Sequence, residues 1–183
     1  MNKQSRAYIH GLLKKNARLD GRKNDDYRKP IKVEYNISKS AEGSAKVTIG
    51  DTIVMAGVKT EVGQPYPDTP NEGSLMVGAE LLPMSNPEFE PGPPGPQAIE
   101  IGRVIDRGIR ESKAIDVKKL CIKEGELVWT IIIDIMIIND AGNLFDASSL
   151  AAIAALKNAR LPALVDDVID YKTLTDEKIP IDK

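Results

Sequence analysis

VWTIIIDIMII, residues 128–138, is the most apolar stretch of this 183-residue chain. Its β-branched residues favour a β-strand, and the turn sequence Asn139-Asp140-Ala141-Gly142-Asn143 follows it directly. The run is broken by Asp134 and is too short to cross a bilayer as a helix. We therefore expect a buried strand in the core of the fold, and a polar turn at its C-terminal end.

Upstream of this strand, the sequence indicates a sheet built from consecutive strands. Alternating apolar and polar residues predict further strands over residues 31–37, 45–49, 52–58 and 74–82. Gly50-Asp51 predicts a hairpin turn, and Glu42-Gly43-Ser44 predicts another turn. Because hairpins join consecutive strands, we expect an α+β fold with a mixed β-sheet packed by helices, not a doubly wound sheet.

Helical periodicity predicts three helices, over residues 3–16, 98–113 and 147–160. Asp146 is the predicted N-cap of the last one, which is rich in Ala and Ser and can pack close to a neighbour. Prolines predict irregular loops over residues 63–73 and 83–96. We expect an N-terminal helix within residues 1–17 and one domain over residues 18–183.

Composition excludes several classes of function. One cysteine, Cys121, and one histidine, His10, rule out a disulfide framework and a multi-cysteine zinc site, and make a Ser–His–Asp triad improbable. The net charge is −2 and the chain has only eight aromatic residues, so any contact with nucleic acid must be local. No signal peptide or membrane span is evident, and we expect a cytoplasmic protein without a membrane partner.

The helix expected over residues 98–113 carries the most informative charge pattern. At 100° per residue, Arg103, Arg107 and Arg110 fall within an arc of about 60°. We expect the opposite side to be buried, and it holds Ile101, Val104, Ile105, Gly108 and Ser112. Guanidinium groups one turn apart suit successive backbone phosphates. The alternative is a solvated face, in which Asp106 pairs with Arg110 along the helix.

Three acidic residues give a second possibility. By alternation, Asp134 shares a strand face with Ile132 and Met136, and a carboxylate buried there would need a partner or a shifted pKa. It is either a catalytic acid or metal ligand, or a carboxylate satisfied by neighbouring donors. Asp140 and Asp146 resemble part of a calcium loop, but the spacing and the closing Glu of an EF-hand are absent. No glycine-rich phosphate loop occurs, and we expect no cofactor and no metal.

Several short motifs, taken in order, resemble a known family. They are Arg18-Leu19-Asp20-Gly21-Arg22 followed by Arg28, Gly43-Ser44, Gly50-x-Thr52-x-Val54-x-Ala56, Leu82-Pro83, and Asp140-x-Gly142 with Asp146-Ala147. This order is similar to that of RNase PH-type domains and covers essentially the whole chain. Phe89-Glu90-Pro91-Gly92-Pro93-Pro94, Arg103, Arg107 and Trp129 further resemble the non-catalytic RNase PH-like subunits of the archaeal exosome.

The resemblance implies a role without chemistry of its own. Such subunits pair with a catalytic RNase PH-like partner, three pairs form a hexameric ring, and RNA-binding cap proteins sit on one face. The ring degrades RNA from its 3′ end with phosphate. Catalytic relatives carry a Gly-Ser-Arg phosphate loop where this chain has Gly142-Asn143-Leu144-Phe145, and paired arginines where it has Gln97-Ala98-Ile99-Glu100. The alternatives are an autonomous phosphorolytic 3′–5′ exoribonuclease, and a metal- or ligand-binding domain built on Asp134, Asp140 and Asp146.

The resemblance also implies site residues and a longer domain. Arg103 and Arg107 match the arginines that contact RNA in the family, and Arg110 is a weaker candidate because Asp106 can occupy it. Relatives continue past residues 179–183 into a second half, so we expect a domain that is incomplete at its C-terminus, with an apolar sheet face exposed. We expect the loop at residues 83–96 to contact another subunit, since its prolines reduce the entropy lost on ordering.

Overall fold

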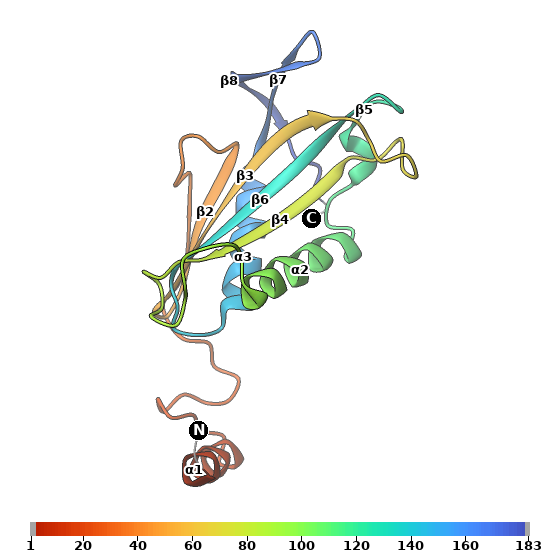
Figure 1. The fold of residues 1–183 in the computed structure, drawn as a ribbon. Helices are drawn as coiled ribbons and strands as arrows, with labels where there is room; N and C mark the ends of the chain where they lie inside the picture. Colours follow the sequence, from red (N-terminus) through yellow and green to blue (C-terminus); the bar gives the residue numbers. More distant parts are fainter. Residues whose placement is uncertain (1–2, 182–183) are drawn as a thin grey trace.

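The computed structural model describes residues 3–181, apart from the side chains of residues 172 and 174, and has the expected α+β architecture (Figure 1). Its main sheet contains β1 (Ile31–Tyr35), β2 (Gly43–Ile49), β3 (Thr52–Gly63), β4 (Ser74–Leu81), β5 (Cys121–Lys123) and β6 (Leu127–Asn139). The helices are α1 (Lys3–Lys14), α2 (Pro96–Glu111) and α3 (Leu144–Asn158), with a 3₁₀ turn, η1 (Val117–Leu120). A separate hairpin joins β7 (Arg160–Val165) and β8 (Val168–Lys178).

The sheet is mixed, as expected, and β6 lies inside it. The strand order is β1-β2-β3-β6-β4, and β5 pairs with one end of β6. All pairs are antiparallel except β4 and β6, which run parallel because α2 lies between them in the chain. The predicted strand at residues 128–138 is therefore confirmed, and β4 lies at an edge of the sheet.

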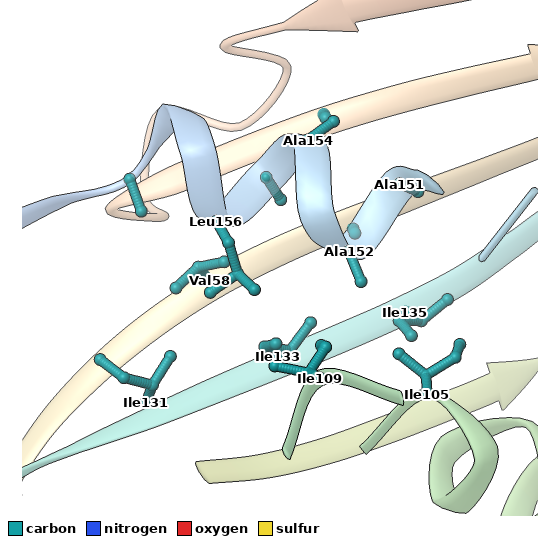
Figure 2. Close-up of a cluster of buried hydrophobic side chains, with 14 of the residues drawn as sticks. Val58, Ile105, Ile109, Ile131, Ile133, Ile135, Ala151, Ala152, Ala154 and Leu156 are labelled. Atoms are coloured by element: carbon teal, nitrogen blue, oxygen red, sulfur yellow. The ribbon is translucent and has the colours of Figure 1, made fainter. Parts of the chain in front are cut away.

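Helices α2 and α3 pack on one face of the sheet and form the core with it (Figure 2). The inward residues of β6 are fully buried and meet Ile105 and Ile109 of α2. The alanines of α3 allow this helix to approach closely. A Cβ on Gly43 would lie 2.5 Å from the carbonyl oxygen of Ala155, so Gly43 begins β2 in contact with α3. The predicted turn at Glu42-Gly43-Ser44 is thus wrong, because Gly43 and Ser44 belong to the strand.

The other face of the sheet is open among the described residues. Asp134 points to this face and is exposed, so the prediction of a buried carboxylate is wrong. The cause is that only one sheet face is covered by helices, and alternation places Asp134 opposite the core. Met76 and Met136 lie on the same face with 55% and 39% of their surface exposed, beside the exposed carboxylates of Asp134 and Glu80.

The start of α3 also differs from the prediction. The N-cap is Asn143, with a left-handed φ of 62°, and it makes no side-chain capping bond. Asp146 lies in the first turn of the helix, where a carboxylate interacts favourably with the helix dipole. The predicted cap was three residues late because the left-handed conformation of Asn143 lets the chain turn into the helix sooner.

The hairpin of β7 and β8 was not predicted from the sequence. Its turn residues, Asp166 and Asp167, both have positive φ, at 50° and 64°. This is the conformation of a two-residue hairpin turn, which Asp tolerates, although the usual glycine is absent. The signal was the repeat of apolar residues on both sides of these two aspartates. The predicted C-terminal boundary at Lys183 lies outside the described residues.

Helix α1 lies apart from the sheet and the other helices (Figure 1). It occupies Lys3–Lys14, within the predicted range, and has no buried residue. Among residues 3–181, no helix is both long enough and apolar enough to cross a membrane.

Candidate functional site

Helix α2 presents the predicted arginine face to solvent. Arg103, Arg107 and Arg110 are all exposed residues. The buried side of the helix is formed by Ala98, Ile101, Gly102, Ile105 and Ile109. Val104, Gly108 and Ser112, which were expected on the buried side, are exposed instead, because α2 tilts its Gly102 side toward the sheet. A Cβ on Gly102 would lie 3.1 Å from the carbonyl oxygen of Val77, so this glycine brings α2 close to β4.

Arg110 is held by the protein itself. Its Nη2 donates to Asp106 Oδ1 at 2.8 Å and to the carbonyl oxygen of Leu75 at 3.0 Å, and its Nε donates to Asp106 Oδ2 at 3.2 Å. The bidentate contact with the Asp106 carboxylate raises the pKa of the Arg110 guanidinium. Arg110 therefore links α2 to β4 and has three of its five N–H donors engaged within the protein.

Arg103 and Arg107 are far less constrained. Arg107 lies 3.6 Å from Glu111 in a pair whose side chains are 76% and 70% exposed, a geometry that contributes little stability. Among the described residues, no carboxylate lies within ion-pair distance of Arg103. Two of the three arginines thus have guanidinium groups available to an anion from outside.

These two arginines border a groove between α2 and the edge strand β4. The groove has a volume of about 590 Å³, and Val77, Gly78 and Ala79 of β4 line it together with residues of α2. Ile99 lies on its wall and is 50% exposed. The lining also includes Asp106 and Glu111, whose carboxylates pair with Arg110 and Arg107, respectively.

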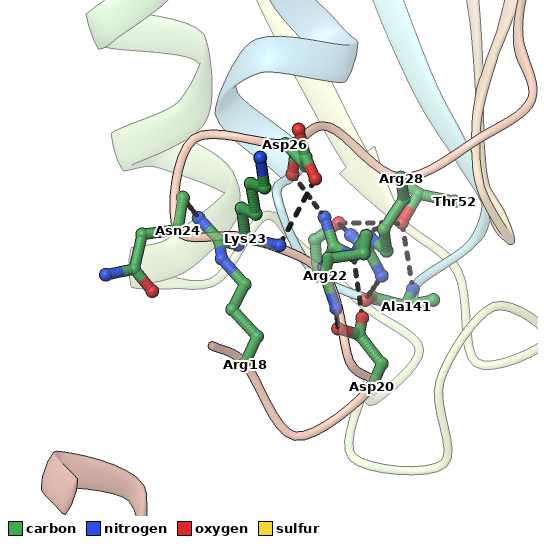
Figure 3. Close-up of polar contacts among 10 residues, drawn as sticks. Arg18, Asp20, Arg22, Lys23, Asn24, Asp26, Arg28, Thr52 and Ala141 are labelled. Carbon is green, nitrogen blue, oxygen red and sulfur yellow. Dashed lines mark hydrogen bonds and ion pairs between the residues drawn. The ribbon is translucent and has the colours of Figure 1, made fainter. Parts of the chain in front are cut away.

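At the turn between β6 and α3, by contrast with the α2 groove, an arginine is bound by acceptors of the protein itself (Figure 3). Arg28 donates to the carbonyl oxygens of Ala141 and Gly142, the latter at 2.6 Å. The buried hydroxyl of Thr52 donates to the same Gly142 oxygen at 2.7 Å and accepts from the Ala141 amide at 3.2 Å. The turn therefore directs two carbonyl oxygens toward the Arg28 guanidinium, which is engaged in holding the turn.

Among the side chains of residues 143–146, which follow this turn, the Asn143 carboxamide is the one group that can donate to an anion. Leu144 is buried and Phe145 is an exposed apolar residue. Asp146 places a carboxylate in the first turn of α3. Residues 142–145, at which the resemblance places the phosphate loop of catalytic relatives, thus supply one carboxamide and two apolar side chains, and Asp146 beyond them adds a negative charge.

The segment before Arg28 forms a polar network that sequence analysis did not predict (Figure 3). Arg22 contacts Asp20 at 2.8 Å and the carbonyl oxygen of Asp26 at 2.6 Å, while Arg18 donates to the carbonyl oxygen of Asn24. The hydrogen bond from Arg22 lowers the pKa of the Asp20 carboxyl. These arginines are engaged within their own loop. Their motif was visible in the sequence, but their partners are mainly backbone carbonyls, which no motif reveals.

The structure does not bring the three predicted acidic residues together. Asp134 lies in the middle of β6, whereas Asp140 accepts hydrogen bonds from Asn86 at 2.9 Å and from the Gly142 amide at 2.8 Å. Within residues 3–181, no group of three His, Cys, Asp or Glu side chains is arranged to hold a metal ion. Asp140 and Asp146 have local roles at the turn and the helix start.

Comparison with known proteins gives consistent matches. Residues 28–162 match the 3′ exoribonuclease family, domain 1. The chain is 50% identical over 176 residues to exosome complex component Rrp42 of Archaeoglobus fulgidus, covering 96% of this chain and 68% of that protein. It is 51% identical over 173 residues to the Rrp42 component of Sulfurisphaera tokodaii, covering 94% of this chain and 62% of that protein. The chain thus spans about two thirds of the length of these curated relatives.

One solved structure extends this likeness to three dimensions. It is described as the Archaeoglobus fulgidus exosome with RNA bound to the active site. A chain of that structure aligns with a TM-score of 0.87 and 49% sequence identity, covering 98% of this chain and 68% of that one.

Proposed function

Because the chain belongs to the 3′ exoribonuclease family of RNase PH, we propose that it is a non-catalytic subunit of an archaeal exosome ring. In this role it pairs with a catalytic RNase PH-like subunit, three pairs form a hexameric ring, and cap proteins that bind RNA join one face. The ring degrades RNA from the 3′ end by transferring each terminal nucleotide to phosphate. The match to an exosome structure with bound RNA supports this assignment.

The observation that supports the non-catalytic role is that Arg28, the cation at the turn after β6, is engaged by the protein itself. Phosphorolysis needs donors that hold the attacking phosphate, and such donors must point toward the anion. Here the carbonyl oxygens of Ala141 and Gly142 point toward Arg28. Arg28 is thus engaged by the protein itself, and the first turn of α3 adds the Asp146 carboxylate and no Ser or Arg side chain. We infer that the attacking phosphate binds in the partner subunit.

The contribution of this chain to RNA binding comes from the groove beside α2. Arg103 and Arg107 are exposed and border the groove, where their guanidinium groups can each bind a backbone phosphate with two hydrogen bonds. Contacts to phosphates carry no base information, so binding should be nearly independent of sequence. Arg110 was a third candidate, and its contacts with Asp106 and Leu75 favour a positioning role, in which it fixes α2 against β4.

The test is a reconstitution with the catalytic partner. The full chain is purified alone, the partner alone, and both together, and each is given labelled RNA and inorganic phosphate. The account expects nucleoside diphosphates to be released rapidly by the pair and not by this chain alone. Release by the isolated chain would show that it is an autonomous exoribonuclease, and failure to form a complex by native mass would remove the proposed partner.

A further inference from the structure

We propose that helix α1 is a second binding surface for the phosphate backbone of RNA, separate from the groove beside α2. The inference rests on the proposed function, since it takes RNA as the ligand. It starts from the distribution of charge along the chain. Residues 1–19 contain five Lys or Arg residues and no Asp or Glu, although the whole chain has a net charge of −2.

The cationic side chains of α1 lie on one side of the helix, together with His10. At 100° per residue, Lys3, Arg6, His10 and Lys14 fall within an arc of about 80°. We call these four residues the α1 stripe. They are all exposed, and no carboxylate lies within ion-pair distance of the stripe among the described residues. The stripe extends over about 16 Å along the helix, at 1.5 Å per residue, which is long enough to follow several nucleotides.

The apolar side of α1 is partly covered by the segment that follows it. Ile9, Leu12 and Ala17 are half-buried, and together with Leu13 and Leu19 they line a small depression of about 320 Å³. Asn24 fixes this arrangement, because its side chain donates to the carbonyl oxygen of Leu13 at 2.9 Å and its amide donates to Asn16 at 3.1 Å. The stripe is the cationic surface of α1, and it is distinct from this apolar depression, beside which Leu13 and Leu19 are exposed.

Its charge favours a polyanion over a neutral protein surface. A helix of 12 residues is marginally stable alone, and α1 has no buried residue, so binding phosphates along one side would also stabilise the helix. The α1 stripe lies outside the packed core, and changes to it should leave the sheet unaffected.

The test uses the chain assembled with its catalytic partner. The stripe variant carries Lys3→Gln, Arg6→Gln and Lys14→Gln. The matched control carries Lys118→Gln, Lys119→Gln and Lys157→Gln, which changes the net charge equally at exposed lysines outside both surfaces. Affinity for single-stranded RNA is measured over a range of salt concentrations, with a short RNA that fills the α2 groove and with a longer one.

For the longer RNA, the stripe variant should reduce the slope of log K against log salt by about 2, at roughly 0.7 per lost contact, while the control has the wild-type slope. Binding of the short RNA should be unchanged in both. Equal slopes for the two variants with long RNA would overturn the inference. So would loss of assembly in the stripe variant, which would identify α1 as a protein contact, or binding of wild type to anionic lipid vesicles in preference to long RNA.

The proposed function has its own control in this experiment. Replacing Arg103 and Arg107 with Glu should weaken binding of both the short and the long RNA. If that variant is impaired and the stripe variant is not, the proposed function stands and the inference about α1 fails. If neither variant differs from wild type, both fail.

Discussion

Two regions of this chain use arginine in opposite ways. In the turn between β6 and α3, Arg28 donates to the carbonyl oxygens of Ala141 and Gly142 and so stabilises the fold itself. Beside β4, Arg103 and Arg107 have almost no acceptors within the protein and face a groove. The difference teaches that the role of an arginine is decided by the acceptors that the fold places around it.

The largest effect on stability is expected from the replacement of Arg28. Arg28→Ala deletes two charge-assisted hydrogen bonds, and it should lower the free energy of unfolding by about 3 kcal/mol. RNA affinity of the assembled pair should stay within twofold of wild type. Urea titration and RNA binding at fixed salt check the two halves. A large loss of affinity with unchanged stability would place Arg28 in the RNA site.

The complementary change acts on the groove. Arg103→Glu combined with Arg107→Glu should weaken RNA binding by the assembled pair about 100-fold, since two charge-assisted contacts of about 1.5 kcal/mol or more are lost. The salt slope should fall by about 1.4. The free energy of unfolding should change by no more than about 0.5 kcal/mol, because both side chains are exposed. Unchanged affinity and slope would exclude these residues from the site.

Arg110 is intermediate between Arg28 and the two groove arginines, because it is bound within the protein and is also half-exposed. Arg110→Ala should cost about 1 kcal/mol of stability, because the pair with Asp106 is half-exposed. It should weaken RNA binding only severalfold and leave the salt slope unchanged, because a positioning residue contributes no phosphate contact. A fall in the slope equal to that of Arg103→Glu alone would make Arg110 a direct RNA contact.

The smallest effect is expected at Glu111. Glu111→Gln removes the exposed partner of Arg107, and the stability should change by less than about 0.5 kcal/mol. Affinity for RNA should rise about twofold, because Arg107 no longer divides its contacts between Glu111 and phosphate. The rise in affinity is measured by titrating fluorescently labelled RNA with the assembled pair and following the fluorescence anisotropy. Weaker binding would show that Glu111 orients Arg107 for RNA.

The strands of the sheet could be predicted from the sequence, but which face of the sheet the helices cover could not. The apolar residues of β6 predicted a central strand, and hairpin signals predicted its neighbours. Asp134 was expected to be buried, because alternation separates two faces of a strand but does not say which one a helix covers. In α2, the arginine face was predicted, whereas Val104 and Gly108 were placed on the wrong side, because tilt depends on the contact of Gly102 with β4.

The part of the site that escaped prediction depends on distant backbone. Arg28 and Gly142 are 114 positions apart, and their contact uses a carbonyl oxygen that every residue possesses. No residue pattern encodes such a pair. The absence of the Ser and Arg phosphate donors at Asn143 and Leu144 could be predicted from the sequence. That the carbonyl oxygens of the turn point toward Arg28 could be seen only in the structure.

The most direct test compares RNA contacts at the two regions in the assembled pair. A photoreactive benzoylphenylalanine replaces Ile99, which is exposed in the α2 groove, or Phe145, which is exposed beside the turn. Both variants are irradiated with bound RNA in the absence of phosphate. The account predicts strong crosslinking from position 99 and only background from position 145. Crosslinking from position 145 with none from position 99 would contradict it.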